Sequence, residues 1–260
     1  MSVSVPPYPR GKNLLEGKVV VITAAAGTGI GFAAAKRCVE EGARVVLSDV
    51  HPRRLGEAAE QLEAIAGRRP PAVICDVTLE AEVQRLFETA IAAEGHVDVM
   101  INNAGLGGTA SLVDMTDEQW MRVLDVTLNG TFRCTRAALR HMIARRAGAI
   151  VNNASVLGWR AQAGQAHYAA AKAGVMALTR CAAIEAAPAG VRVNAVAPSL
   201  AMHPFLAKVT PPGLLEELTA REAFGRAAEP WEVANVMIFL ASDYASYLTG
   251  EIVSVSSQHP

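Results

Sequence analysis

A tyrosine and a lysine lie four residues apart in an alanine-rich stretch, and a serine precedes them. Tyr168 and Lys172 belong to HYAAAKAGVMALTR, and Ser155 lies 13 residues before Tyr168 in IVNNASVLGW. Residues four apart share one face of an α-helix, so the phenol and the ammonium can converge on one point. A nearby cation lowers the pKa of a tyrosine. The pattern therefore indicates an acid/base centre at Tyr168, with Ser155 bonded to the same substrate oxygen.

An isolated Tyr-x-x-x-Lys pair is more often a pair of surface neighbours, so the surrounding elements decide its meaning. Apolar runs predict strands at 19–23, 45–48, 72–75, 97–102, 149–153, 191–197 and 252–255. Helical patterns lie between them at 30–42, 52–67, 79–95, 116–146, around Tyr168, at 214–221 and at 231–241. Continuous apolar strands that alternate with helices predict a single α/β domain, a doubly wound parallel sheet of about seven strands with helices on both faces.

The composition limits the classes of function and the boundaries of the domain. Hydrophobic residues make up 51% and charged residues 19% of the 260 residues, which suits a well-buried α/β protein, and the net charge of -1 without a basic run argues against nucleic-acid or membrane-surface partners. Residues 1–13 hold three prolines and no apolar core, which indicates a short flexible arm rather than a signal peptide. The domain then covers residues 14–260.

The four cysteines are widely scattered and form no Cys-x-x-Cys pair. This spacing predicts neither a zinc site nor a disulfide framework, so we expect no metal. Buried, reduced thiols in a cytoplasmic protein are the simpler interpretation. No apolar run is long enough to span a membrane.

A glycine-rich turn follows the first predicted strand and opens a helix. It contains Gly27, Thr28, Gly29 and Ile30, and backbone N–H groups at such a turn bind pyrophosphate. Asp49 ends the second strand 20 residues beyond Gly29, where a carboxylate hydrogen-bonds ribose hydroxyls and repels a 2′-phosphate. The arrangement predicts a Rossmann-type site for NAD. The neighbouring Arg53 and Arg54 leave NADP possible.

Several motifs together resemble the short-chain dehydrogenase/reductase family, from about Leu14 to Ser256. They are Asn102-Asn103-Ala104-Gly105 after the fourth strand, the set Ser155, Tyr168 and Lys172, Asp76 in CDV, and VRVNAVAP with Pro198 and TGEIV near the end. The resemblance implies hydride transfer between a nicotinamide and a secondary alcohol or ketone. It implies that Tyr168 is the general acid/base, that Ser155 orients the substrate oxygen and that Lys172 holds the nicotinamide ribose. The remaining implied cofactor contacts are Asp76 at the adenine, Val77, Asn103, Ala104, Gly105 and Pro198.

The chain departs from the family pattern at several sites. The first loop reads TAAAGTGIG where the family has TGxxxGIG, and Thr127 replaces the asparagine of the long helix. Asn129 lies two residues later on a different helix face and cannot substitute. Thr127 can still hydrogen-bond, so we expect a fourth catalytic residue with a modified proton relay. Ser199 replaces a glycine, and His203 falls near the position that meets the carboxamide of the cofactor.

Residues 199–229 follow the sixth strand at the edge where α/β sheets bind ligands, and we expect an apolar substrate loop there. Trp159, Arg160 and His203 are candidate substrate contacts. Small residues along the Tyr168 helix suit close helix pairing, and with the resemblance they predict a homotetramer, or a dimer as the fallback.

ASVLGWRAQ, HYAAAKAGVMALTRC and EAFGRAAEPWEVA are similar to one actinobacterial branch of the family, the reductases of steroid-ring catabolism that act on indene-carboxyl-CoA thioesters. The expected substrate is therefore a small molecule, hydrophobic or a CoA thioester. Two alternatives remain open. One is a 3-oxoacyl carrier-protein or CoA reductase of fatty-acid metabolism that uses NADPH, and the other is a cofactor-binding regulator without turnover.

Overall fold

The computed structural model describes residues 3–202, 206 and 212–257, and a parallel seven-stranded sheet forms its centre. The strand order is β3-β2-β1-β4-β5-β6-β7. Because the order reverses beside β1, the carboxyl ends of β1 and β4 flank the point where such sheets bind ligands. The predicted fold class is confirmed. The strands are β1 Val19–Ile22, β2 Arg44–Asp49, β3 Ala72–Ile74, β4 Val99–Asn102, β5 Gly148–Asn153, β6 Val191–Pro198 and β7 Ile252–Val255.

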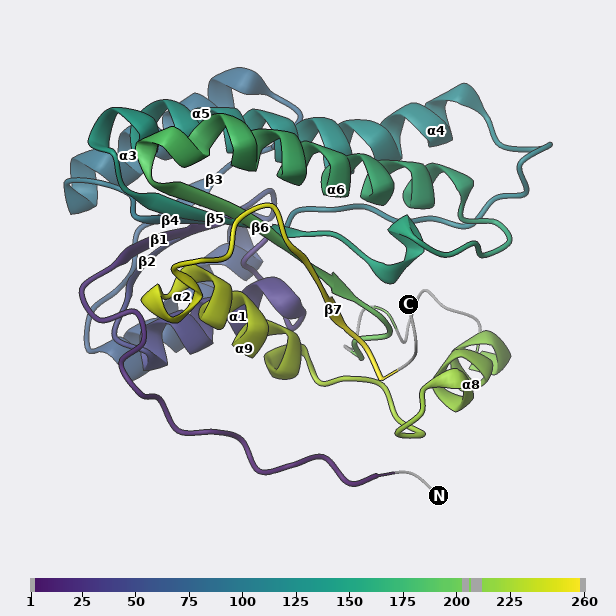
Figure 1. Ribbon diagram of the computed structural model, residues 1–260. Coiled ribbons are helices and arrows are strands. Elements are labelled where there is room, and N and C mark those ends of the chain that lie inside the picture. The colour runs from purple at the N-terminus through teal and green to yellow at the C-terminus, as the bar shows by residue number, and fades with distance from the viewer. Residues whose placement is uncertain (1–2, 203–205, 207–211, 258–260) are drawn as a thin grey trace.

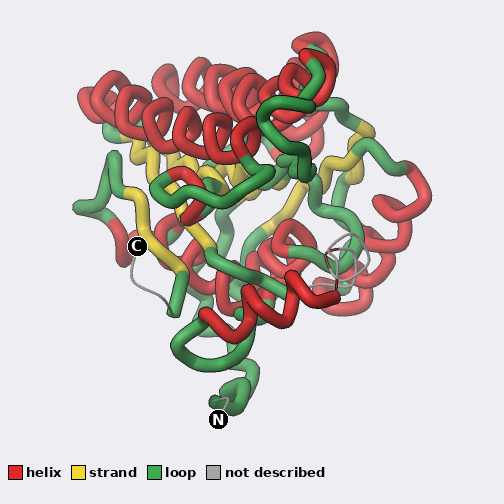
Figure 2. Tube along the Cα trace, turned by 90° about the vertical axis from the view of Figure 1, so that its right-hand side faces the viewer, coloured by secondary structure: helices red, strands yellow, loops and turns green. Residues whose placement is uncertain are grey.

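Helices cover both faces of the sheet, as Figures 1 and 2 show from two directions. One layer holds α3 Glu80–Glu94, α5 Gly130–Arg145 and α6 Ala166–Ala186, and the opposite layer holds α1 Ile30–Glu40, α2 Pro52–Ala66 and α9 Pro230–Ala241 (Figure 1). The remaining α-helices of the described chain are α4 Asp117–Leu124 and α8 Pro212–Arg221. In the described part of the chain, no helix is long and apolar enough to cross a membrane.

The apolar strands are buried because each side of the sheet has its own helical cover. Val20 and Ile22 of β1 pack into the cluster beneath α1, α2 and α9, whereas Val21 packs into the cluster beneath α3, α5 and α6. Successive side chains of a strand point to opposite faces, so two covered faces require an unbroken apolar run. This is why the strands carry no polar alternation.

The long helix predicted over residues 116–146 is two helices joined by a π-helical turn. Thr116 caps α4 and forms a capping box with Gln119, and Asp125–Asn129 then form the π turn before α5 begins. A π turn inserts an extra residue into the helix and is frequent at functional sites. Thr127 lies in this turn and is fully buried.

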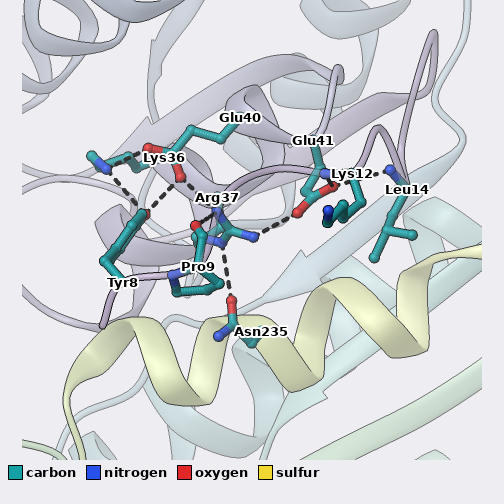
Figure 3. A network of polar contacts seen from close by, with 9 residues as sticks. All are labelled: Tyr8, Pro9, Lys12, Leu14, Lys36, Arg37, Glu40, Glu41 and Asn235. Carbon is teal, nitrogen blue, oxygen red and sulfur yellow. Dashed lines mark hydrogen bonds and ion pairs between the residues drawn. The ribbon is translucent and has the colours of Figure 1, made fainter. Parts of the chain in front are cut away.

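The described part of the N-terminal arm lies along α1 and α9 (Figures 1 and 3). The Tyr8 hydroxyl donates to Glu40, 2.6 Å away, and the Tyr8 ring meets the Trp231 ring edge-on at 5.3 Å between centroids. The Lys36 ammonium lies 4.3 Å from the Tyr8 ring centroid. Val3 N–H donates to the carbonyl of Phe224 at 2.7 Å. These contacts hold Val3 and Tyr8 against the domain, and the flexibility expected of residues 1–13 stays a prediction.

A buried ion pair lies at the C-terminal end of α1, beside the N-terminal segment (Figure 3). Arg37 donates to Glu41 at 2.5 Å, and both side chains are almost fully buried. The other carboxylate oxygen of Glu41 accepts the backbone N–H groups of Lys12 and Leu14 at 2.7 and 3.1 Å. Removing one partner of a buried ion pair leaves the other charge uncompensated.

We therefore expect Glu41→Ala to lower the free energy of unfolding by about 3 kcal/mol, because the buried Arg37 keeps only the more exposed Glu40 as an anionic partner and the N–H groups of Lys12 and Leu14 lose their acceptor. Glu40→Ala is the matched control. Glu40 also pairs with Arg37, at 2.8 Å, and accepts the Tyr8 hydroxyl, but it is more exposed and binds no backbone N–H of Lys12 or Leu14, so its loss should cost about 1 kcal/mol. Urea unfolding of both variants measures the difference. Equal losses would contradict the assignment of Glu41 as the anchor of the arm.

Candidate active site

Ser155, Tyr168 and Lys172 meet at the carboxyl edge of the sheet. Ser155 follows β5 and is buried, and its hydroxyl accepts the N–H of Leu157 at 3.2 Å as it caps a short 3₁₀ turn. Tyr168 and Lys172 lie in the first two turns of α6. The side chains of Ser155 and Tyr168 lie close enough for the serine hydroxyl to lower the pKa of the tyrosine. The structure therefore brings together the three residues that the sequence predicts as an acid/base set.

Burial controls the protonation of this set. It raises the pKa of Tyr168 above its ordinary value, and the Ser155 hydroxyl opposes that shift. It lowers the pKa of Lys172 to about 8. The sequence pattern predicted a lowered pKa for the tyrosine, whereas in the protein alone burial outweighs that tendency. The Lys172 ammonium lies 5.5 Å from the Tyr168 ring centroid, where a positive charge favours the phenolate.

Lys172 is held by Asn153, a residue that the sequence analysis did not single out. Its ammonium donates to the backbone carbonyl of Asn153 at 2.5 Å. The Asn153 side chain donates to Asn103 Oδ1 at 3.0 Å, and Asn103 Nδ2 donates in turn to the carbonyls of Thr23 and Ala24 at 3.2 and 3.1 Å. The lysine end of the site is thus connected to the loop after β1.

A second, fully internal amide pair lies one residue earlier in each strand. Asn102 and Asn152 are register partners on β4 and β5, and Asn102 Nδ2 donates to Asn152 Oδ1 at 2.8 Å. Asn102 also donates to Thr135 of α5 at 3.0 Å, and Asn152 donates to Thr179 of α6 at 2.9 Å. The matching words INNA and VNNA at the two strand ends were the signal that could have revealed this pairing.

The glycine-rich loop leaves space where a phosphate-binding turn needs it. Gly27 has φ of +90° and has no neighbouring atom within 4 Å of the place where a Cβ would lie. At Gly31 a Cβ would lie 2.1 Å from the carbonyl oxygen of Ala24 and 2.4 Å from Asn103 Nδ2, so only glycine fits. Ala24 replaces the usual glycine and takes φ of +49°. A left-handed alanine costs about 1 kcal/mol.

Asp49 ends β2 beside this loop. Its carboxylate accepts the N–H of Ala26 at 3.2 Å and the N–H of His51 at 3.0 Å. Burial raises the pKa of Asp49, and the bond from Ala26 and the charge of Arg54 oppose the rise. Arg53 points into solvent and pairs with Glu57 at 3.2 Å. The carboxylate is therefore fixed by backbone donors next to the loop that contains Gly27, Thr28, Gly29 and Ile30.

Asp76 and Val77 follow β3 on the same edge of the sheet. Asp76 Oδ1 accepts the N–H and the hydroxyl of Thr78 at 2.9 and 2.8 Å, which fixes the turn. Val77 is buried against Gly130, where an added Cβ would lie 2.5 Å from a Val77 methyl carbon. The carboxyl ends of β2, β3 and β1 therefore carry Asp49, Asp76 and the turn at Gly27. In this architecture a dinucleotide binds along these strand ends.

The Thr127 hydroxyl is hydrogen-bonded to the loop after β4. It donates to the carbonyl of Leu106 at 3.1 Å and accepts the N–H of Leu106 at 2.9 Å. The segment Asn103, Ala104 and Gly105 is held from the other side, because Thr23 Oγ1 accepts the N–H groups of Asn103 and Ala104 at 3.0 Å each. The side chain of Asn129 donates to Asp125 instead, as its different helix face predicts.

The predicted substrate residues lie after β5 and β6. Trp159 is 43% exposed and ends the 3₁₀ turn that begins beyond Ser155, and Arg160 N–H donates to the carbonyl of Val156 at 2.9 Å. Pro198 ends β6 opposite Val255 of β7. His203 lies outside the described residues. The two described ends of the segment 199–229 meet, because Met202 N–H donates to the carbonyl of Ala228 at 2.9 Å.

Comparison with known proteins agrees with this arrangement. A family model described as enoyl-(acyl carrier protein) reductase matches residues 24–257. The chain is 62% identical to (5R,7aS)-5-hydroxy-7a-methyl-1-oxo-2,3,5,6,7,7a-hexahydro-1H-indene-carboxyl-CoA reductase of Mycobacterium tuberculosis, over 100% of both chains. It is 40% identical to the 3-oxoacyl-(acyl-carrier-protein) reductase of Thermotoga maritima, over 93% of this chain and 97% of that protein.

A solved structure shares the whole architecture. A short chain dehydrogenase from Mycobacterium smegmatis superposes with a TM-score of 0.88 at 56% identity, and the match covers 99% of each chain. With the parallel sheet, the glycine-rich turn and the Ser155–Tyr168–Lys172 set in place, these matches establish that the chain belongs to the short-chain dehydrogenase/reductase family and is an oxidoreductase of alcohols and ketones.

Proposed function

We propose that the protein transfers hydride between NAD(H) and a bulky cyclic secondary alcohol or ketone that is carried as a CoA thioester, in the breakdown of steroid rings. The full-length identity of 62% to a reductase whose name specifies such a bicyclic CoA ester is the observation that carries the proposal. The intact set of Ser155, Tyr168 and Lys172 supports turnover and counts against a cofactor-binding regulator.

The side chains divide the acid/base work. In reduction, Tyr168 donates its proton to the carbonyl oxygen of the substrate, and the Ser155 hydroxyl hydrogen-bonds the same oxygen. Lys172 supplies the cation that stabilises the phenolate left behind, and its own position is fixed by the Asn153 carbonyl. The nicotinamide cofactor supplies the hydride when bound.

The residues fit a nicotinamide dinucleotide. Only glycine fits at Gly31, and Gly27 leaves its turn open, so the backbone can approach a pyrophosphate. Asp49 would hold the ribose of NAD and repel the 2′-phosphate of NADP. The charge of Arg54 lowers the pKa of Asp49 and so favours the anionic carboxylate that this role requires. Together these features favour NAD, with NADP as the weaker coenzyme.

The principal enzymatic alternative is a 3-oxoacyl carrier-protein or CoA reductase that uses NADPH. The relative from Thermotoga maritima favours it, at 40% identity. Asp49 counts against the NADPH part. Within the preferred function, Arg160 and Trp159 would contact the substrate at the mouth of the site, and residues 199–229 would cover it.

Thr127 is proposed as a positioning residue. It is buried, and its hydroxyl binds both backbone polar groups of Leu106, so its donor hydrogen is already used. This arrangement favours a role in holding the loop beside Tyr168 over the direct proton relay that the sequence suggested. The loop it holds connects the cofactor-side segment Asn103–Gly105 to the substrate side.

We also propose that the protein is a cytoplasmic homotetramer. The side chains of Ala170, Ala177 and Cys181 form an exposed stripe of small groups along α6, and Ile184 continues it at 77% exposure. Gly174, in contrast, packs against Leu128 of the same chain, where an added Cβ would lie 2.8 Å from a Leu128 methyl carbon. The buried cysteines Cys38, Cys75 and Cys134 are free thiols, which suits a reducing compartment.

The function is tested by following reduced-nicotinamide absorbance with NAD and NADP against ring-containing and linear substrates. We expect turnover with NAD and a hydroxylated indene-carboxyl-CoA thioester, and much weaker turnover with NADP and linear 3-hydroxyacyl thioesters. Tyr168→Phe should retain NAD binding and lose at least about 100-fold in turnover, because the proton donor is absent. Preference for NADP and linear substrates would establish the alternative instead.

The role of Thr127 is tested with Thr127→Val, which keeps the shape of the side chain and removes the hydroxyl. The N–H and the carbonyl of Leu106 then lose their partner, which should lower the free energy of unfolding by about 1 kcal/mol and reduce kcat. Thr127→Ser keeps the hydroxyl and should restore most of kcat. If Thr127→Ser and Thr127→Val had equal kcat values, the hydroxyl would have no positioning role.

The tetramer is tested by sedimentation equilibrium. Wild-type protein should have four times the chain mass of 27.4 kDa. Ile184→Glu places a charge on the exposed α6 stripe and should shift the mass downward, because desolvating an unpaired charge at an interface is unfavourable. A wild-type monomer would refute the proposal.

A further inference from the structure

Three glycines of the loop after β4 face side chains of α6, those of Lys172, Tyr168 and His167. A Cβ built on Gly105 would lie 3.4 Å from the Lys172 ammonium. One built on Gly107 would lie 3.8 and 4.0 Å from Cδ2 and Cε2 of the Tyr168 ring, and one built on Gly108 would lie 3.2 Å from His167 Nε2. The loop therefore forms a wall without side chains beside the reacting phenol, apart from Leu106.

The wall is held at both ends. Leu106 is bound through its N–H and its carbonyl by the buried Thr127 hydroxyl. At the far end, Ala110 N–H donates to the carbonyl of Gly164 at 3.1 Å, and Gln165 Nε2 donates to Thr109 Oγ1 at 3.1 Å. Because the segment between these anchors is short, the wall cannot withdraw freely from Tyr168.

The helix side of the wall is also fixed. His167 is buried, and its Nδ1 accepts the backbone N–H of Tyr168 at 2.9 Å. An Nδ1 that accepts a hydrogen bond leaves the proton of the neutral imidazole on Nε2, the atom that faces Gly108. A Cβ at Gly108 would lie closer to this imidazole than an ordinary contact allows, so packing disfavours a side chain there.

Gly107 is different, because neither packing nor backbone strain requires a glycine there. Its φ lies outside the left-handed region, and an added Cβ would make ordinary van der Waals contacts with the Tyr168 ring. The residue is also exposed. An added methyl group would occupy open space next to Cε2, the ring carbon adjacent to the one that bears the hydroxyl. What a glycine preserves at this position is therefore the space itself.

We propose that Gly107 is a specificity-determining residue, which keeps open the side of Tyr168 where the ring of a cyclic substrate lies. In a cyclic secondary alcohol, both neighbours of the reacting carbon belong to a rigid ring and cannot rotate away from the wall. An acyclic alcohol can place its small substituent there. The inference rests on the proposed function, because the open space at Gly107 explains how the bulky ring of the proposed substrate reaches the phenol.

The test measures kcat/KM of Gly107→Ala and Gly107→Val on secondary alcohols of increasing width: 2-butanol, cyclohexanol and 2-decalol. Gly107→Ala should lose about tenfold or more on 2-decalol, and its loss should shrink stepwise through cyclohexanol to 2-butanol. Gly107→Val should steepen the gradient. The loss on 2-decalol should fall mainly on KM, because the hydroxyl of Tyr168 is unchanged.

Gly56→Ala is the matched control. Gly56 lies inside α2, and an added Cβ there meets no atom within 4 Å, so this variant should match the wild type on all three alcohols. Thermal unfolding and binding of NADH by fluorescence confirm that the Gly107 variants are folded and retain the cofactor site. A uniform loss on all three alcohols, or no loss, would overturn the role of Gly107.

The two proposals fail in different ways. If the wild type prefers linear acyl thioesters to the ring thioester, the proposed function fails. In that case the ratio of variant to wild-type kcat/KM across the alcohol series still measures how much space the glycine leaves between Gly107 and Tyr168. If the wild type uses the ring thioester and the ratio is flat, only the role of Gly107 fails.

Discussion

The arrangement of the active edge depends on one buried hydrogen bond, between the side-chain amides of Asn102 and Asn152. A buried amide without a partner costs about 1–3 kcal/mol, so β4 and β5 keep the register in which these two residues are opposite each other. Each amide then reaches one helix, Thr135 of α5 or Thr179 of α6. The polar pair thus sets the position of α6 over the sheet, which apolar packing alone would determine less sharply.

The following residue of each strand extends this constraint to the chemistry. Side chains alternate between the faces of a strand, so Asn103 and Asn153 point away from the helices that bind their predecessors. They bond to each other, Asn103 reaches the loop after β1, and the Asn153 carbonyl receives Lys172. The same doubled asparagine therefore fixes the helix that carries Tyr168 and the cation beside it. Burial lowers the pKa of Lys172 to about 8, so the ammonium and the neutral amine differ little in free energy near neutral pH.

The sequence predicted what depends on local pattern, and missed what depends on tertiary contacts. Continuous apolar runs and their alternation with helices predicted the parallel sheet, and spacing predicted the meeting of Tyr168 and Lys172. The direction of the Tyr168 pKa was missed because burial, the largest influence, is a property of the folded chain. The partner of Thr127 was missed because Leu106 is 21 residues away. Gly174 shows the same limit, since a small residue on a helix suits an internal neighbour such as Leu128 as well as a second subunit.

The departures from the family pattern lie where the backbone has another support. Ala24 adopts a left-handed conformation that favours glycine, but its carbonyl accepts Asn103 Nδ2 and it packs over Gly31, so the strained turn is held from two sides. Thr127 is shorter than asparagine, and it binds the adjacent loop through both polar groups of Leu106. Each change therefore concerns how a loop is held, and neither lies at Ser155, Tyr168 or Lys172. Because the residues that hold the loops are separate from the acid/base residues, the loop after β4 can change the shape of the pocket while the acid/base set stays the same.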